Sequence, residues 1–357
     1  RSGFRRDNRN KQKEKKIMYI KTVHRDNLSV EANVRRMPNG DLLLVCTCGD
    51  VCEPAPGNRV YLFRSTDDGL SWSDKILLGK EDGQAHYHTE TTVVGDQILV
   101  FVTKHDGKFL NWRNYVYQST DSGFTWQEKP FAPLYKYAFV RSMTKLSNDT
   151  LLFPYHYFPV TEEQEAECVK NGGYVWNNAV DYYESGFLIS DANANDFERH
   201  KAFDITNEDI NKFNIKWVWT ENTVIEAENG HLIMLFRIDK SGCLWRSDSF
   251  DFGKTWEKPY ATDIPNPANK PQLLKADKNR IVLINTPNSV YGLDNRYPLS
   301  VWISDDGLKS FVKKINLSDF PGGYSYANGF IENNILYLAF EFNRHDIYFA
   351  KIDLEKD

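Results

Sequence analysis

Apolar and polar residues follow one short pattern six times along the chain, in which two apolar runs flank a tight polar turn. Clear examples are residues 91–101 (TTVVGDQILVF), 223–236 (TVIEAENGHLIMLF) and 329–340 (GFIENNILYLAF). Apolar runs joined by Asn, Asp or Gly are typical of β-hairpins. The sequence therefore predicts six hairpins and requires no long helix. Their turns lie at 39–40, 95–96, 148–149, 229–230, 277–278 and 333–334.

A second repeat follows most of the hairpins. A third apolar run ends at a Ser that begins the phrase Ser-x-Asp-x-Gly-x-Thr-Trp. Clear copies occupy residues 65–72, 119–126 and 249–256, and weaker copies occupy 190–197 and 304–311. The first residues of successive copies lie 54, 71, 59 and 55 positions apart. This near-regular spacing indicates one supersecondary unit that is copied several times.

The two ends of the chain complement each other. The sixth hairpin is followed by a third strand at 347–354 but by no fourth strand, whereas residues 18–23 (MYIKTV) have no hairpin of their own. The sequence therefore predicts an all-β fold, a six-bladed β-propeller whose ring is closed by the N-terminal strand. We expect residues 18–357 to form this single domain, after a disordered basic tail at 1–17.

One predicted connection, at about 156–183, is longer than most loops in compact domains. Its aromatic residues would suit a lid that stacks on sugar rings. The alternative is a short helix over residues 161–170 (TEEQEAECVK) that covers the blade.

Composition excludes several classes of function. A net charge of -5 gives no nucleic-acid footprint, and no run of 18 apolar residues is present to span a membrane. The five cysteines form no regular framework, and Cys46, Cys48 and Cys52 lack partners at metal-ligand spacing, so we expect no disulfide scaffold, metal or cofactor. Residues 1–17 lack the apolar core of a signal peptide, which fits a cytoplasmic protein or a secreted one whose signal has been removed.

Chemically active residues gather at one end of the predicted blades. In a four-stranded antiparallel blade, the start of the innermost strand and the loop between the second and third strands share one end, and such loops on a rigid scaffold carry function. The strand starts supply Glu31, His86, His88, Arg141, Glu221, Lys270 and Tyr326. The loops supply Asp50, Glu53, His105, Asp106, His156, Tyr157, Arg237, Asp239, Arg296, Glu341 and Arg344. We therefore place the candidate site at this end.

The repeated phrase, between the third and fourth strands, resembles the Asp-box (BNR) repeat of the sialidase superfamily, whose members are six-bladed propellers. The resemblance covers about residues 18–354. The boxes themselves are structural: Ser, Asp and Gly form the turn, and Trp packs between sheets.

Two segments extend the resemblance to catalytic residues. Residues 221–237 (ENTVIEAENGHLIMLFR) resemble the fourth-blade segment of sialidases, which implies that Glu221 activates the nucleophile. Residues 324–341 (YSYANGFIENNILYLAFE) resemble the last-blade segment, which implies a nucleophile at Tyr326, with Tyr324 as the alternative.

A third segment implies substrate-binding residues. Residues 294–307 (DNRYPLSVWISDDG) resemble the fifth-blade stretch that carries a carboxylate-binding arginine, which maps onto Arg296. Arg237 and Arg246 are candidates for a neighbouring arginine. Further substrate-binding candidates at this end are Arg141, Glu341 and Glu53.

These assignments imply a retaining exo-glycoside hydrolase, sialidase-like, that acts on a terminal acidic sugar of a glycan. A neutral tyrosine, deprotonated by a glutamate, avoids the repulsion that a carboxylate nucleophile would suffer from an acidic substrate. Arginines bind the substrate carboxylate by charge-assisted, bidentate hydrogen bonds.

Two departures from the sialidase pattern leave alternatives open. The usual Phe/Tyr-Arg-Ile-Pro motif is absent, and Val30 or Glu31 occupies the place of its arginine. The acid/base aspartate has no clear counterpart in the 48–58 loop, where Asp50 or Glu53 could serve. His86 and His88 are alternative acid/base residues, because histidine titrates near neutral pH. A His/Tyr/Arg site would suit a propeller polysaccharide lyase or a non-sialidase glycosidase on uronate-containing glycans, and a non-catalytic glycan-binding propeller is the third alternative.

Overall fold

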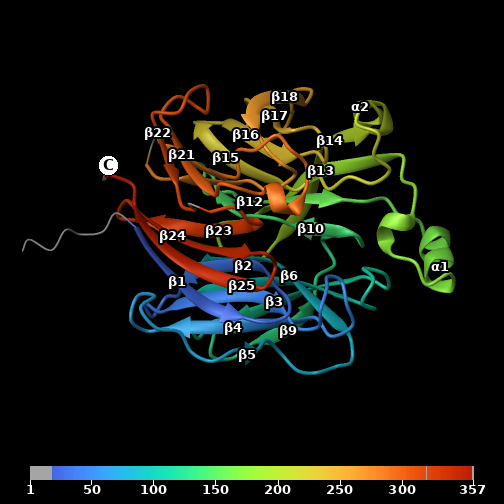
Figure 1. Cartoon of the computed structure of the whole chain (residues 1–357), viewed down its shortest axis with the longest axis horizontal. Helices are drawn as coiled ribbons and strands as arrows, with labels where there is room; N and C mark the ends of the chain where they lie inside the picture. The colour runs from blue at the N-terminus through green and yellow to red at the C-terminus, as the bar shows by residue number, and fades with distance from the viewer. Residues whose placement is uncertain (1–17, 278, 319, 356–357) are drawn as a thin grey trace, which may run out of the picture.

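Six antiparallel sheets follow one another along the chain and form a β-propeller in the computed structural model, which describes residues 18–277, 279–318 and 320–355 (Figure 1). The basic tail expected at 1–17 lies outside the described residues. The first blade contains β2 (Ser29–Arg36), β3 (Leu42–Cys48), β4 (Arg59–Ser65) and β5 (Ile76–Leu77). The second contains β6 (Ala85–Val94), β7 (Gln97–His105), β8 (Arg113–Ser119) and β9 (Gln127–Pro130).

The next two blades keep this order. In the third blade the innermost strand is divided into β10 (Ala138–Val140) and β11 (Thr144–Lys145), followed by β12 (Leu151–Tyr157), β13 (Tyr182–Ser190) and β14 (Phe197–Thr206). The fourth contains β15 (Asn222–Glu228), β16 (His231–Arg237), β17 (Cys243–Ser249) and β18 (Tyr260–Pro265).

The last two blades complete the ring, and the N-terminal strand closes it as predicted. The fifth contains β19 (Gln272–Lys275), β20 (Ile281–Asn285), β21 (Ser300–Ser304) and β22 (Lys313–Asn316). The sixth contains β23 (Tyr324–Glu332), β24 (Ile335–Phe342), β25 (Asp346–Asp353) and β1 (Met18–Arg25). Strand β1 pairs antiparallel with β25, from Met18 opposite Ile352 to Arg25 opposite Asp346, so the two ends of the chain share one sheet.

Burial follows the position of each strand in its blade. Every residue of β3 (LLLVCTC) is buried, because the second strand lies inside the sheet with a neighbouring blade on each face. In contrast, all four residues of the outer strand β9 (QEKP) are exposed. Short, charged outer strands of this kind protect a sheet edge from pairing with other chains.

The Asp-box turns are held by their own side chains. In the first box, the Ser65 hydroxyl donates to Asp67 at 2.8 Å and accepts from the backbone N–H of Gly69 at 2.8 Å. Gly69 has φ +90° and lies against the ring of Phe349 in the last blade, so a Cβ there would be strained and would collide with that ring. The repeated spacing within the box thus reflects backbone conformation and packing between blades.

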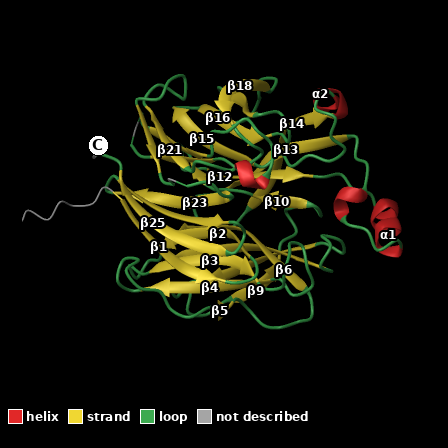
Figure 2. Ribbon diagram, viewed as in Figure 1, coloured by secondary structure: helices red, strands yellow, loops and turns green. Residues whose placement is uncertain are grey.

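The long connection of the third blade contains the short helix that the sequence offered as one alternative. Helix α1 (Glu162–Lys170) begins at Thr161, which forms a capping box with Gln164, and the 3₁₀ turn η1 (Val175–Asn177) follows (Figure 2). Two other short elements, α2 (Asn207–Asn211) and η2 (Leu293–Asn295), also lie in connections. Across the described ranges, no helix has the length and apolar character needed to cross a membrane.

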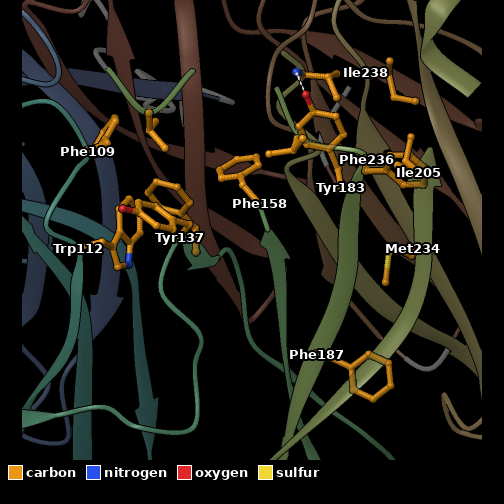
Figure 3. Close-up of a cluster of buried hydrophobic side chains, with 14 of the residues drawn as sticks. Phe109, Trp112, Tyr137, Phe158, Tyr183, Phe187, Ile205, Met234, Phe236 and Ile238 are labelled. Atoms are coloured by element: carbon orange, nitrogen blue, oxygen red, sulfur yellow. Dashed lines mark hydrogen bonds between the residues drawn. The ribbon is translucent and has the colours of Figure 1, made fainter. Parts of the chain in front are cut away.

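An aromatic core joins the second, third and fourth blades. Figure 3 shows Phe109, Trp112 and Tyr137 on one side of Phe158, and Tyr183 and Phe236 on the other. Partly buried tryptophans, Trp176, Trp217 and Trp219, pack against the same cluster. This core therefore supports one wall of the cavity described next.

Candidate active site

A cavity of about 810 Å³ opens at the end of the propeller where the innermost strands start. Residues from all six blades line it, and they belong to strand starts or to loops between second and third strands. The placement agrees with the end chosen from the sequence. The lining comprises Asn27, Leu28, Val51, Cys52, Glu53, Tyr87, Phe109, Phe139, Arg141, Trp176, Trp217, Trp219, Glu221, Arg237, Asp239, Pro267, Ala268, Tyr291, Gly292, Leu293, Arg296, Tyr326, Asn343, Arg344 and His345.

Tyr326 and Glu221 form a hydrogen-bonded pair in this cavity. The Tyr326 hydroxyl donates to Glu221 Oε1 at 2.9 Å, although the two residues lie in the last and the fourth blades. Tyr326 is 8% exposed and Glu221 is 1% exposed. Burial and the negative charge of Glu221 raise the pKa of Tyr326, so the resting phenol is neutral. The two catalytic residues implied by the resemblance are thus brought together.

Backbone irregularities aim two of the central side chains. The pairing of β23 with β24 shifts register between Ser325 and Asn328, and Tyr326 has φ +49°. The pairing of β2 with β3 shifts between Val30 and Asn33, and Glu31 has φ +56°. Bulges re-aim side chains and are frequent beside active sites, and positive φ is unfavourable for residues other than glycine. The strain at Tyr326 therefore indicates a requirement for its side chain at the cavity, and the strain at Glu31 a requirement for its carboxylate beside Arg141.

Two arginines surround Glu221 and hold it as a carboxylate. Arg141 donates to Glu221 Oε1 at 2.8 Å and to Glu31 Oε1 at 2.7 Å, and Arg237 Nη1 lies 3.0 Å from Glu221 Oε2. Burial alone raises the pKa of Glu221, but the charges of Arg237 and Arg141 outweigh it, and the net shift is downward. An ionised Glu221 beside a neutral Tyr326 is the state that a base needs before reaction.

Arg296 differs from these arginines, because the hydrogen bonds it makes go to neutral groups. Its Nη atoms donate to the Ala268 carbonyl at 2.7 Å and to the Ser325 hydroxyl at 2.8 Å. Its buried Nε has no hydrogen-bond partner among the described residues. Arg237 donates to the same Ala268 carbonyl at 2.9 Å, so the two guanidinium groups lie side by side. This pair presents positive charge to the cavity.

The start of the innermost strand of the first blade carries a buried carboxylate, Glu31. Glu31 is fully buried beside Arg141 and Tyr87, and its backbone N–H donates to Glu341 Oε2 at 3.0 Å. Burial, together with the nearby carboxylates Glu53 and Glu31, raises the pKa of Glu341 to about 7. Neither Glu31 nor Glu341 lines the cavity. The expected contact between Glu341 and substrate is therefore not supported by its position.

Glu53 and Arg344 face the cavity from the first and the last blades. Glu53 forms an ion pair with Arg344, and both residues line the cavity. Arg344 was not among the site residues predicted from the sequence. Arg344 brings a further guanidinium group to the cavity from another blade, although Glu53 neutralises its charge. Asp50 instead accepts from the backbone N–H groups of Val51 and Gly57, outside the cavity lining.

The structure does not bring the two histidines to the cavity. The Nδ1 of His88 lies 2.8 Å from the Glu31 carbonyl oxygen, and its Nε2 lies 2.8 Å from the Thr91 hydroxyl. Burial lowers the pKa of His88 to about 3. The Nε2 of His86 lies 2.9 Å from Asp82, and burial lowers the pKa of His86 as well. Because both rings contact protein groups away from the cavity, neither is positioned as an acid or base there.

Arg246 also lies elsewhere. It binds Asp248 through two hydrogen bonds of 2.7 Å and the Gly307 carbonyl of the fifth blade at 3.0 Å. Arg246 is the fourth residue of β17 (Cys243–Ser249), so it lies along the strand and outside the loop between β16 and β17 that reaches the cavity. Arg246 therefore packs against the neighbouring blade and does not line the cavity.

Sequence reasoning missed the tryptophans that line the cavity beside Glu221. Trp217, Trp219 and Glu221 alternate along the segment KWVWTE (216–221), which is the period of an extended chain. Once Glu221 is placed, this alternation predicts that both tryptophans face the same way. Trp176 of the long connection joins them, and its ring stacks on Tyr174 with centroids 4.6 Å apart. Among the residues that the structure describes, no group of three or more His, Cys, Asp or Glu is placed to hold a metal ion.

The fold and the cavity together define a sialidase-like propeller. Residues 80–338, well over half of the chain, match the BNR repeat-like domain family, and the chain belongs to that family. The sequence matches no curated protein at a significant level.

Solved structures with the same fold are distant in sequence. The Hadza microbial sialidase Hz136 is 15% identical with a TM-score of 0.70, and the match covers 94% of this chain and 68% of that one. A protein of unknown function from Dyadobacter fermentans is 16% identical with a TM-score of 0.68, covering 94% and 99% of the two chains. The Trypanosoma rangeli sialidase is 14% identical with a TM-score of 0.66, covering 92% of this chain and 55% of the longer enzyme. At these identities the comparisons establish the fold.

Proposed function

We propose that the protein is a retaining exo-glycoside hydrolase, sialidase-like in mechanism, that removes a terminal acidic sugar from a glycan. The observation that carries the proposal is the 2.9 Å hydrogen bond from Tyr326 to Glu221 in a cavity that Arg296 also lines. A nucleophile, its base and a cation without an acidic hydrogen-bond partner are the groups that such a reaction requires.

The pair supplies the chemistry of attack. Tyr326 attacks the anomeric carbon while its proton passes to Glu221, and Arg237 Nη1, 3.4 Å from the phenol oxygen, stabilises the charge that develops there. The raised pKa of Tyr326 keeps the nucleophile neutral until attack, so an anionic sugar approaches without repulsion from it. The product of this step is a covalent glycosyl-tyrosine, which water then hydrolyses with retention.

The arginines supply the preference for an acidic sugar. Arg296 and Arg237 lie side by side on the Ala268 carbonyl, and Arg237 already shares its charge with Glu221. Arg296 is therefore the principal anchor for a substrate carboxylate. Because the arginine of the sialidase motif is absent, we expect binding weaker by about 2–5 kcal/mol than a three-arginine clamp gives.

The test is a substrate screen combined with one substitution. Full-length protein is incubated with terminal sialosides, terminal uronides and uronate polysaccharides, and the products are identified by mass spectrometry. Tyr326→Phe should lower kcat by at least about 10³-fold on whichever glycoside is cleaved, because the covalent nucleophile is lost. Tyr324→Phe is the matched control: it lies two residues earlier on β23, donates to the Phe320 carbonyl at 3.4 Å and does not line the cavity.

Two outcomes would contradict the proposal. Turnover by Tyr326→Phe within a few-fold of the native protein would remove Tyr326 from the mechanism. An unsaturated product that absorbs in the near ultraviolet would instead indicate a lyase.

A further inference from the structure

Among the residues that the structure describes, three acidic side chains line the cavity, and two of them already have strong partners. Glu221 binds Tyr326 and two arginines, and Glu53 is paired with Arg344. The third, Asp239, lies in the loop between β16 and β17 and is 6% exposed. Its only ion pair is a long one, 3.6 Å from Oδ1 to Arg237 Nε, and that oxygen has no hydrogen-bond partner within the described part of the chain.

We propose that Asp239 is the general acid that protonates the glycosidic oxygen of the leaving group. The inference rests on the proposed function and assigns the acid/base role that the sequence left open. The geometry supports it: Asp239 lines the same cavity as Tyr326, beside the arginine that contacts both Glu221 and the Tyr326 hydroxyl. Its unpartnered oxygen can meet a substrate oxygen without first breaking a hydrogen bond. The earlier candidates His86, His88 and Asp50 do not line the cavity.

The surroundings raise the pKa of this carboxyl group, so that about half of it is protonated near pH 6. Burial raises the pKa of Asp239 to about 6, and the opposing charge of Arg237 only partly compensates. The charged or titratable groups that act on it are Arg237, Glu221, Arg296, Tyr291 and Tyr183, and a backbone hydrogen bond from Trp219 also reaches it. Glu221 in the same cavity has its pKa shifted downward, so the two carboxyl groups are separated into an acid and a base.

Over the two steps of the reaction, each side chain that gives or takes a proton returns to its starting state. In the first, the bond from the anomeric carbon to the leaving oxygen breaks, Asp239 gives that oxygen its proton, and the Tyr326 proton passes to Glu221. In the second, Asp239 takes a proton from the water that attacks the anomeric carbon, and the departing Tyr326 oxygen recovers its proton from Glu221. One water is consumed, and both carboxyl groups return to their starting states.

The experiment compares leaving groups. Asp239→Asn should lower kcat/KM about 10²–10⁴-fold on a glycoside with an alkyl or sugar leaving group, which needs protonation. On the 4-nitrophenyl glycoside of the same sugar, whose leaving group departs as an anion, the loss should stay below about tenfold. The fall of native kcat/KM above about pH 6 on the alkyl substrate should also disappear in the variant.

Two matched variants isolate the role. Asp263→Asn, on the exposed face of β18 in the same blade, controls for the substitution itself. Glu53→Gln tests the acidic cavity residue that is paired with Arg344. Equal losses on both leaving groups in Asp239→Asn would mean that the residue acts only through Arg237 and would overturn the inference, as would a leaving-group effect that appears in Glu53→Gln instead. If the native protein cleaves no glycoside, the proposed function itself is wrong. If the native protein cleaves the glycosides but Asp239→Asn shows no leaving-group effect, only the role of Asp239 is wrong.

Discussion

The two ends of the propeller hold their polar groups in opposite ways. At the box end, each turn satisfies its own side chains: in the second box, Asp121 accepts from Ser119, Phe124 and Thr125, all within the same turn. At the cavity end, hydrogen bonds join distant blades, such as Arg141 of the third blade to Glu31 of the first and Glu221 of the fourth.

This difference explains what each end can do. A box turn is local, exposed and repeated, and its function is to connect strands at a fixed geometry. The cavity contains charges that are buried, unequal and dependent on the whole ring. Burial strengthens the interaction between two charges, but it also makes a charge that loses its partner costly. Catalysis is therefore expected at the cavity end, where the blades carry different side chains.

The largest expected effect comes from breaking a buried bridge. Arg141→Met leaves the carboxylates of Glu31 and Glu221 without their shared partner, and all three side chains are at most 2% exposed. We expect a loss of about 3–5 kcal/mol in the free energy of unfolding, because uncompensated buried charges remain. The measurement is urea unfolding at neutral pH.

The box end offers a matched control for Arg141. Arg36 also bridges two acids, Glu332 at 2.8 Å and Asp68 at 2.9 Å, but the side chains of these acids are 41% and 44% exposed. Arg36→Met should cost about 1 kcal/mol or less, because solvent screens exposed pairs. Similar losses in the two variants would show that burial does not distinguish the two ends.

The second prediction concerns Glu341. Its replacement should stabilise the protein, whereas replacement of Arg141 destabilises it, and the effect should depend on pH. The pKa of Glu341 is about 7 in the folded protein against 4.5 unperturbed, so the folded state binds more protons than the unfolded state between these values. Stability should therefore fall as pH rises from 4.5 to 7 and stay low above it, by about 3 kcal/mol in total from this group. Glu341→Gln should remove this dependence and stabilise the protein at pH 8. Unfolding measured at pH 5 and pH 8 checks it, and a variant less stable than native protein at pH 8 would contradict the assignment.

The sequence predicted the two ends unequally well. Spacing alone revealed the boxes, the six blades and the closing strand, because each depends on local turn chemistry or strand length. It located Glu221, Tyr326 and Arg296 through similar segments. It misplaced His88, because the shift in pairing between His88 and Glu90 and the contact with the Glu31 carbonyl depend on the first blade. Asp239 was visible in its loop, but its burial and the lack of a hydrogen-bond partner for Oδ1 among the described residues arise only from the folded ring.

A smaller effect than those of Arg141 and Glu341 tests the box end itself. The Ser119 hydroxyl donates to Asp121 at 2.7 Å and accepts from the buried N–H of Gly123 at 2.9 Å. Ser119→Ala leaves this N–H without its acceptor, which should cost about 1–2 kcal/mol of stability. Catalytic constants should remain unchanged, because the turn lies at the end of the blade away from the cavity. A change in kcat without a change in stability would contradict the separation of the two ends.

A weaker copy of the box sharpens this test. The Ser190 hydroxyl makes one long hydrogen bond, 3.4 Å to Asp191, and residue 194 is an alanine whose N–H binds the Asp191 carbonyl instead. Ser190→Ala should therefore cost clearly less than Ser119→Ala, although both serines are 3% exposed. Equal costs would mean that the hydroxyl stabilises the strand end through burial alone. A larger cost for Ser119 would show that the repeated Ser-x-Asp-x-Gly spacing stabilises the turn by giving one buried N–H group its acceptor.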